Sequence, residues 1–237
     1  MYKYLKYKLT VITFILIGCG ALYATPTQLK LKDTLVNIDS TGLDNEYVTV
    51  TKNVSNVGNS KEGAYSYRII VALTNTKINS NKGVINLKRG ETVVCSANDS
   101  YQLLTGEYFE VSVKKNHPKP VAPRVWHEPG KNNTVFENDE FRIFEERLAP
   151  GGVRALHSHL ERVVVRLNNV QLTDPRFFPI GEEGKGIQVP NTVKFAPPME
   201  HVVKNLGSIP LFNIVIEFKA PGSVSYTHLT LPTIYSV

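Results

Sequence analysis

Short apolar segments rich in β-branched residues recur along most of the chain, and glycine, proline or asparagine residues separate them. Residues 47–51 (YVTVT), 68–73 (RIIVAL), 163–167 (VVVRL) and 212–218 (FNIVIEF) are four such segments. Segments of this kind between turn-forming residues are typical of β-strands, and no stretch beyond the first 24 residues shows a helical period. The pattern therefore predicts an all-β protein built as a sandwich or a barrel.

The pattern of strands occurs twice. Residues 67–78 (YRIIVALTNTKI) resemble residues 161–172 (ERVVVRLNNVQL), and further on residues 91–94 (ETVV) resemble residues 191–194 (NTVK). An internal repeat of this kind is the signature of two related units. We therefore expect two tandem domains, and one larger sandwich with a coincidental similarity is the alternative.

A proline-rich stretch at residues 117–123 (HPKPVAP) separates the two repeats. Closely spaced prolines make a stiff, extended connector. We place a first β-domain at residues 25–116 and a second at residues 117–220. The second repeat is longer, and its extra residues are expected in a loop rich in glycine and proline between Asp174 and Gly186.

The first residues have the composition of a secretory signal. Three lysines precede an apolar run at residues 9–18, which is short for a membrane span. Residues 16–19 (LIGC) resemble the bacterial lipobox, in which the cysteine, here Cys19, is acylated after cleavage; a signal-peptidase site after Ala24 is the alternative. Both alternatives predict a signal at residues 1–24 and an exported protein, either periplasmic or anchored to the envelope as a lipoprotein.

The last residues are also expected to lie outside the fold. Residues 224–237 include the string VSYTHLTLPT, which resembles the translated end of a sequencing adaptor. The resemblance implies that the natural C-terminus is missing. We therefore exclude these residues from the fold and His228 from the candidate ligands.

Charge and cysteine content narrow the classes of function. The formal net charge is +6, half of which comes from the lysines of the signal, and there is no arginine-rich stripe with interleaved aromatic residues. This mild positive charge does not indicate a nucleic-acid partner. With Cys19 acylated or removed, Cys95 is left alone, so no internal disulfide is expected. Its place after an apolar run predicts a buried strand residue.

One segment, GGVRALHSHLE, carries two closely spaced histidines. Alternate side chains of a strand point to one face, so His157, His159 and Glu161 are predicted to share a face. Val163 and Val165 would continue that face as the apolar interior of a barrel.

A third histidine, His201, follows on a later predicted strand, from which it can meet the first two across the barrel. Burying two imidazoles and a carboxylate costs free energy unless they have a partner. A metal ion provides one, because it takes the imidazole lone pairs and the negative charge together. For each histidine the alternative is a solvated or hydrogen-bonded surface ring.

These segments resemble the two motifs of the cupin superfamily. Gly151, followed by the His-x-His sequence and a downstream glutamate, resembles the first motif, and Pro197, His201 and Asn205 resemble the second. The resemblance covers roughly residues 134–219. It implies two tandem cupin-like (jelly-roll) β-barrels, of which the second carries a metal site.

The first repeat lacks the residues that would ligate a metal. Gly63, Tyr65 and Tyr67 stand where the second repeat has His157, His159 and Glu161. The first half is therefore expected to be a degenerate barrel, kept for packing, for docking or for covering one side of the second.

The cofactor that the resemblance implies is a divalent metal ion, Fe, Mn, Ni or Zn. Its implied ligands are His157, His159, His201 and Glu161. The spacing departs from the family pattern at Glu161, which follows His159 after one residue and not after three or four. Glu161 is therefore either a ligand or a rim carboxylate paired with Arg162 or Arg154.

Two main classes of function follow. The first is a metal-dependent enzyme acting on a small molecule, with oxygenases, isomerases and decarboxylases as the precedents that the resemblance implies. Arg154, Arg166 and Glu200 are candidates for substrate contact, although strand parity places Arg166 on the outer face. The second class is a non-catalytic envelope module that binds a sugar or a carboxylate and holds a structural metal. A barrel pair that binds no metal is a third alternative.

The expected partners follow from the same features. A small-molecule ligand is expected and nucleic acid is not. A membrane is contacted only through a lipid anchor on Cys19. The sequence is compatible with a homodimer but does not predict one.

Overall fold

The computed structural model describes four stretches of the chain, residues 43–54, 64–121, 132–176 and 186–221. The predicted signal at residues 1–24 with Cys19, the segment at residues 224–237 and Gly63 lie outside the described residues, as does most of the predicted glycine- and proline-rich loop. Among the described residues, no helix has the length and apolar character needed to cross a bilayer.

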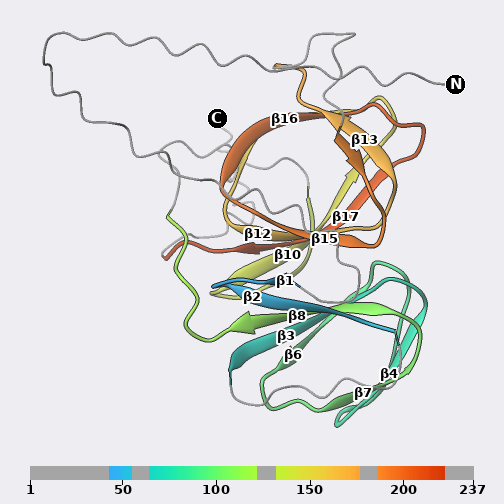
Figure 1. Ribbon diagram of the computed structural model, residues 1–237, viewed down its shortest axis with the longest axis vertical. Coiled ribbons are helices and arrows are strands. Elements are labelled where there is room, and N and C mark those ends of the chain that lie inside the picture. Colours follow the sequence, from blue (N-terminus) through green and yellow to red (C-terminus); the bar gives the residue numbers. More distant parts are fainter. Residues whose placement is uncertain (1–42, 55–63, 122–131, 177–185, 222–237) are drawn as a thin grey trace, which may run out of the picture. The chain divides into compact units, whose positions relative to one another are not determined.

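The described residues form seventeen strands in four antiparallel sheets, two in each half of the chain (Figure 1). The five-stranded sheet of the first half contains, in hydrogen-bonded order, β1 (Leu43–Asp44), β2 (Val48–Asn53), β8 (Tyr108–Lys114), β3 (Tyr65–Ala72) and β6 (Thr92–Ser96). Its three-stranded sheet contains β5 (Gly83–Leu87), β4 (Thr76–Ser80) and β7 (Tyr101–Thr105). We call these two sheets the first barrel.

The second half contains a five-stranded and a four-stranded sheet, which we call the second barrel. The five-stranded sheet contains β9 (Asn133–Glu137), β10 (Phe141–Leu148), β17 (Leu211–Phe218), β12 (Arg162–Arg166) and β15 (Thr192–Ala196). The four-stranded sheet contains β14 (Gly186–Gln188), β13 (Val170–Thr173), β16 (Met199–Asn205) and β11 (Val153–His159).

The strand order of the two five-stranded sheets confirms the repeat. The sheet of the first half has the order β1-β2-β8-β3-β6. The sheet of the second half, β9-β10-β17-β12-β15, has the same order when the strands of that half are counted from β9 and β11 is left out. The segment of the first half that corresponds to β11 falls at residues 55–63, outside the described residues. An all-β fold with two tandem cupin-like barrels is therefore confirmed. The domain boundaries stay a prediction.

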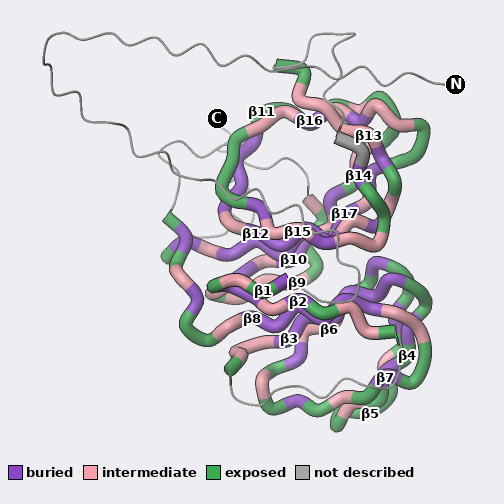
Figure 2. Tube along the Cα trace, in the orientation of Figure 1, coloured by how far each residue is buried: buried purple, intermediate pink, exposed green. Residues whose placement is uncertain are grey.

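One face of each five-stranded sheet contributes to a shared hydrophobic core. Ile69 and Val111 of the first barrel and Val163 and Ile216 of the second are fully buried in it. Figure 2 shows the resulting run of buried residues along the strands of both sheets. Because side chains alternate along a strand, the neighbours of these residues face the interior of each barrel.

Val163 and Val165 lie in this shared core and not in the interior of the second barrel. The prediction that they continue the histidine face is wrong. The chain turns at Leu160 and Glu161, between β11 and β12, and the alternation of β11 does not carry across that turn.

The two barrel interiors differ in composition. The first contains an apolar cluster of seven buried residues, among them Cys95, whose predicted burial in a strand is confirmed. In the second, the buried apolar cluster consists of Phe144, Val164 and Val215. Several of the remaining inward positions of its five-stranded sheet are charged. Buried charged residues are typical of functional sites, so this interior is the candidate location of one.

Truncation of Ile69 tests the shared core. The side chain is fully buried among residues of both five-stranded sheets, so Ile69→Ala should lower the free energy of unfolding by about 2–5 kcal/mol. Val135→Ala, at a position that is 45% exposed, is the control and should change that free energy by less than about 0.5 kcal/mol. Urea denaturation followed by circular dichroism measures both, and equal effects would contradict the burial of Ile69.

Candidate metal centre

Two neighbouring strands of the second barrel bring the predicted histidines together. β11 supplies His157 and His159, and β16 supplies His201, which lies directly opposite His157 in the strand pair. The pairing is irregular between Arg154 and His157, and the two residues between them are exposed. This β-bulge lets both Arg154 and His157 be buried although an odd number of positions separates them.

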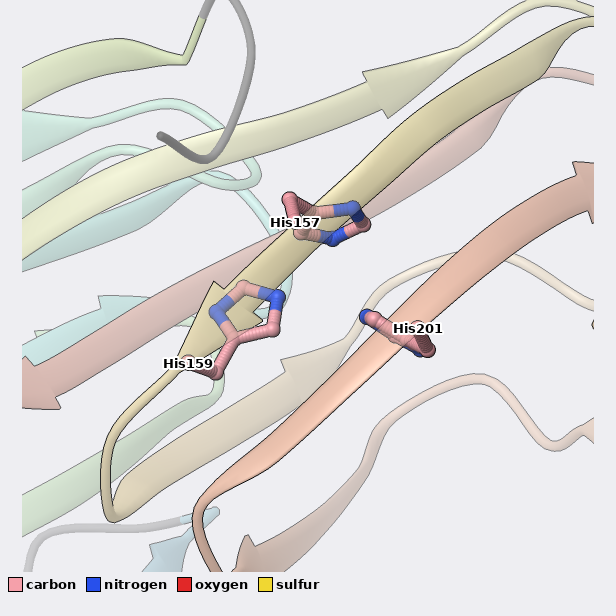
Figure 3. Close-up of side chains that lie close together, drawn as sticks. All are labelled: His157, His159 and His201. Atoms are coloured by element: carbon pink, nitrogen blue, oxygen red, sulfur yellow. The ribbon is translucent and has the colours of Figure 1, made fainter. Parts of the chain in front are cut away.

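The three rings gather in one place (Figure 3). The ring centroids are 4.8 Å apart for His157 and His159, 4.4 Å for His157 and His201, and 5.3 Å for His159 and His201. One ring nitrogen of each residue lies within 4.8 Å of the other two, so a single ion can be held between them. The structure thus brings the three predicted histidines together, and that they hold a metal ion stays a prediction.

A backbone hydrogen bond shows which nitrogen of His157 is available. Its Nδ1 lies 2.8 Å from the carbonyl oxygen of Ala155. Because a carbonyl can only accept, Nδ1 carries the proton and Nε2 keeps a lone pair. The Nε2 atoms of His157 and His201 are buried and have no hydrogen-bond partner among the described residues. Buried polar atoms without partners are costly, and a metal ion fits these two.

Glu217 on β17 holds the ring of His159. Its Oε2 lies 2.7 Å from His159 Nδ1, and its Oε1 accepts a hydrogen bond from Arg142 at 2.8 Å. Burial raises the pKa of Glu217, and the charge of Arg142 opposes that rise and favours the carboxylate form. His159 Nδ1 then donates to Glu217, which leaves its Nε2 as the ligand atom.

Burial keeps the histidine rings neutral. Desolvation is the largest cause that lowers the pKa of His159 and of His201 to about 2. It lowers the pKa of His157 in the same way. Neutral imidazole is the form that ligates metals, so the rings are in the protonation state that a metal site needs.

The glycine and asparagine of the two motif-like segments join β11 to β16. Gly151 has a φ of +70°, a left-handed conformation that glycine adopts without strain. Its N–H donates to the carbonyl of Asn205 at 2.9 Å. The Asn205 side chain is fully buried and donates to the carbonyls of Leu148 and Ile209. These bonds fix the ends of the two strands that carry the histidines.

The structure does not bring Glu161 into the histidine cluster. β11 ends at His159 and β12 begins at Arg162, so Glu161 lies in the turn between them, and its predicted place on the histidine face is wrong. Its carboxylate interacts with Tyr47 of the first barrel and, after burial, contributes to raising the pKa of Tyr47 to about 12. Within the described residues it forms no ion pair with Arg162 or Arg154.

Two of the residues proposed for substrate contact have other roles. Arg154 is buried, and its guanidinium forms an ion pair with Glu146 at 2.9 Å. Glu200 is exposed and lies 3.7 Å from Arg176. Neither belongs to the histidine cluster.

Arg166 lies on the inner face of β12. It is paired across the strands with Asn213, and Val164, two positions before it, belongs to the apolar cluster of the interior. The prediction that Arg166 lies on the outer face is wrong, and the reason is the same as for Glu161. The alternation of side chains was counted from β11 through the turn into β12, where it does not continue.

Sequence reasoning missed four charged residues of this interior, Arg142, Glu146, Arg162 and Glu217. Arg162 and Glu217 are less than 5% exposed, and Glu217 makes contacts with both His159 and Arg142. Glu217 is the one charged residue of β17, a strand with six apolar residues, and this was the signal from which its burial could have been suspected.

No protein-family model and no curated protein matches the sequence. Among solved structures, an IolB-like protein from Salmonella typhimurium LT2 is similar to this chain, with 11% identity and a TM-score of 0.50 over 81% of this chain and 96% of that chain. A cupin 2 conserved barrel domain protein from Leptotrichia buccalis is 13% identical, with a TM-score of 0.49 over 75% of this chain and 86% of that chain. The oxalate decarboxylase of Lactobacillus farciminis is 14% identical, with a TM-score of 0.46 over 77% of this chain and 84% of that chain. Cupin-domain proteins are thus among the structural neighbours, and at these identities the likeness shows the fold alone.

Glu217→Gln tests the role of the buried carboxylate. The change keeps the shape of the side chain but removes the charge that orients His159, so the affinity for a divalent metal should fall about 10- to 100-fold. Glu145→Gln removes a carboxylate on β10 that pairs with Arg147 instead, and it should leave the affinity unchanged. Competition with a chromophoric chelator measures both, and equal affinities for Glu217→Gln and wild type would refute the role.

His201 makes the stability of the metal-free protein depend on pH. An unfolded histidine takes up a proton near pH 6.5, whereas folded His201, with a pKa of about 2, stays neutral. Between these values the unfolded state binds more protons. The free energy of unfolding therefore falls as the pH drops below 6.5, by up to about 1.4 kcal/mol per pH unit for this residue.

Urea denaturation of the chelated protein at about pH 7.5 and about pH 5.5 measures this loss. His201→Gln should lose less stability between the two pH values than wild type. Parallel losses would show that His201 is not held in the neutral form.

Proposed function

We propose that this cupin-fold protein binds one divalent metal ion through the Nε2 atoms of His157, His159 and His201 and presents it to a small-molecule ligand. The observation that supports the proposal most directly is the clustering of three ring nitrogens within 4.8 Å of one another. Two of these rings, His157 and His201, have a buried Nε2 without a hydrogen-bond partner within the described chain. A solvated or hydrogen-bonded surface histidine, the alternative, would not leave its ring nitrogen buried and unpaired.

The ligand set narrows the choice of metal. Three imidazole nitrogens without a carboxylate suit Zn(II), Fe(II) or Ni(II) better than Mn(II), which prefers oxygen ligands. When bound, the ion offers open coordination positions at which a ligand oxygen can be held and polarised.

The surrounding side chains support such a site in two ways. Glu217, itself paired with Arg142, sets the tautomer and the orientation of His159. The ring of Phe144 stacks against His159, with centroids 6.4 Å apart and an interplanar angle of 5°. Phe144 belongs to the apolar cluster of the interior, and such a layer excludes water and strengthens the interaction of charges near the histidines.

A non-catalytic binding module is the second candidate. Acid–base catalysis needs a side chain that can exchange a proton with the substrate. Glu146 and Glu217, the buried carboxylates of the described part of this interior, each use both oxygens in contacts with arginine, asparagine or histidine side chains. Because both carboxylates are already occupied by these contacts, the site is better suited to binding a ligand than to proton transfer by a carboxylate.

Metal analysis of the purified protein tests the proposal. Wild-type protein prepared without chelator should contain about one equivalent of a divalent transition metal, and His157→Ala and His201→Ala should each lose it. His117→Gln changes a buried histidine outside the cluster and should keep the metal, which makes it the matched control. Wild-type protein that binds no metal would refute the proposal.

Thermal unfolding of the same samples separates an open site from a structural one. If the variants lose the metal and keep the melting temperature of wild type, the ion belongs to an open, functional site. If the second barrel unfolds without the ion, the metal is mainly structural.

A further inference from the structure

The interior of the second barrel holds more positive than negative side chains. Its described residues include four arginines, Arg142, Arg154, Arg162 and Arg166, and two carboxylates, Glu146 and Glu217. Arg142 pairs with Glu217 at 2.8 Å, and Arg154 pairs with Glu146 at 2.9 Å. Arg162 and Arg166 form no ion pair with a described residue, although the charges of Glu217 and Glu146 act on Arg162 from farther away. Arg166 lies at the opposite end of β12 from the turn that follows His159.

Neither glutamate has an oxygen free to form an ion pair with Arg162. Glu217 accepts from Arg142 through Oε1 and contacts His159 Nδ1 through Oε2. Glu146 accepts from Arg154 through Oε1 and from an asparagine amide on β17 through Oε2. Each of the four carboxylate oxygens therefore already has a donor.

Arg162 is buried, with an exposed fraction of 4%, at the start of β12. Its Nη1 donates to the carbonyl oxygens of Leu160 and Pro197, at 3.2 and 2.9 Å, and it forms no ion pair with any described residue. Across the strand pair it lies opposite Glu217. Because Glu217 also contacts His159 at 2.7 Å, this register places Arg162 beside the histidine cluster.

A buried guanidinium that forms no ion pair is unfavourable, and a bound metal would add positive charge to this interior. The histidines are neutral and Glu161 lies outside the cluster, so a divalent ion would bring two further positive charges near Arg162. A negative ligand between the ion and the guanidinium removes this repulsion. It also gives a partner to the N–H groups that the two backbone carbonyls do not use. A carboxylate matches the planar fork of a guanidinium.

We infer that the ligand of the second barrel is a small carboxylate-bearing molecule, which Arg162 holds beside the histidine cluster. The inference rests on the proposed metal site. Of the two ligands expected from the sequence, a sugar and a carboxylate, the carboxylate is the one that fits Arg162. Arg162 is then a specificity-determining residue. Removing it should weaken carboxylate binding but leave metal binding equal or tighter, because a repulsive charge near the ion is gone. An arginine with only a structural role would not separate the two affinities in this way.

Titration of acetate into the cobalt(II)-loaded protein tests the inference, with the visible spectrum of the cobalt as the readout. Wild type should bind acetate, and its neutral analogue acetamide should bind far more weakly. Arg162→Gln should weaken acetate binding about ten- to a hundredfold without weakening cobalt binding. Arg147→Gln removes an exposed arginine of β10 that pairs with Glu145 and should leave both affinities unchanged.

The outcomes separate this inference from the proposed function. Acetate affinity that Arg162→Gln does not change, in protein that still holds cobalt, would overturn the inference and leave the metal site standing. Wild-type protein that binds no cobalt would overturn the proposed function itself. If Arg162→Gln does not fold, Arg162→Lys keeps the charge and removes the planar fork; it should weaken acetate binding severalfold, and unchanged affinity would overturn the inference.

Discussion

Three neutral imidazole rings share the interior of the second barrel, and the rest of the centre depends on keeping them buried there. Two of the rings use Nδ1 to reach acceptors of the protein, the carbonyl of Ala155 and the carboxylate of Glu217. Nδ1 is thereby occupied in both rings, which leaves Nε2 of each as the atom that can bind a metal. The β-bulge before His157 and the backbone hydrogen bonds of Asn205 with Gly151 and Gly152 hold the two strands in the register that makes this possible.

The two barrels share a strand order but differ in what their interiors contain. Their five-stranded sheets bury one common apolar core, and the first barrel adds an apolar cluster of its own. Burial of this apolar surface supplies stability. The second interior can therefore hold arginines, glutamates and histidines whose burial costs free energy. In this view the first barrel contributes stability, and the second contributes the chemistry.

Patterns within a strand were enough to predict much of this fold. Alternation and turn residues indicated the strands, internal similarity indicated the two barrels, and the spacing of His157 and His159, with His201 farther on, indicated the cluster. Prediction failed where the chain leaves strand geometry. The turn after His159 restarts the alternation, so Glu161 and Arg166 were assigned to the wrong faces.

The charged residues around the histidines could not be predicted in the same way. Glu217 meets His159 because β17 pairs with β12 and β10, a register between segments far apart in the sequence. Arg162 forms no ion pair because both carboxylates are occupied by other partners. Such a balance of charges is a property of the assembled interior, and no local pattern carries it.

The position of a bound ion is the most direct test of this account. Anomalous diffraction from crystals of the zinc- or nickel-loaded protein locates the ion without reference to any activity. The account predicts a single peak in the second barrel, about 2.0–2.2 Å from the Nε2 atoms of His157, His159 and His201, with no ligand atom from Glu161. A peak elsewhere, ligation through Nδ1, or an oxygen of Glu161 bound to the ion would contradict it.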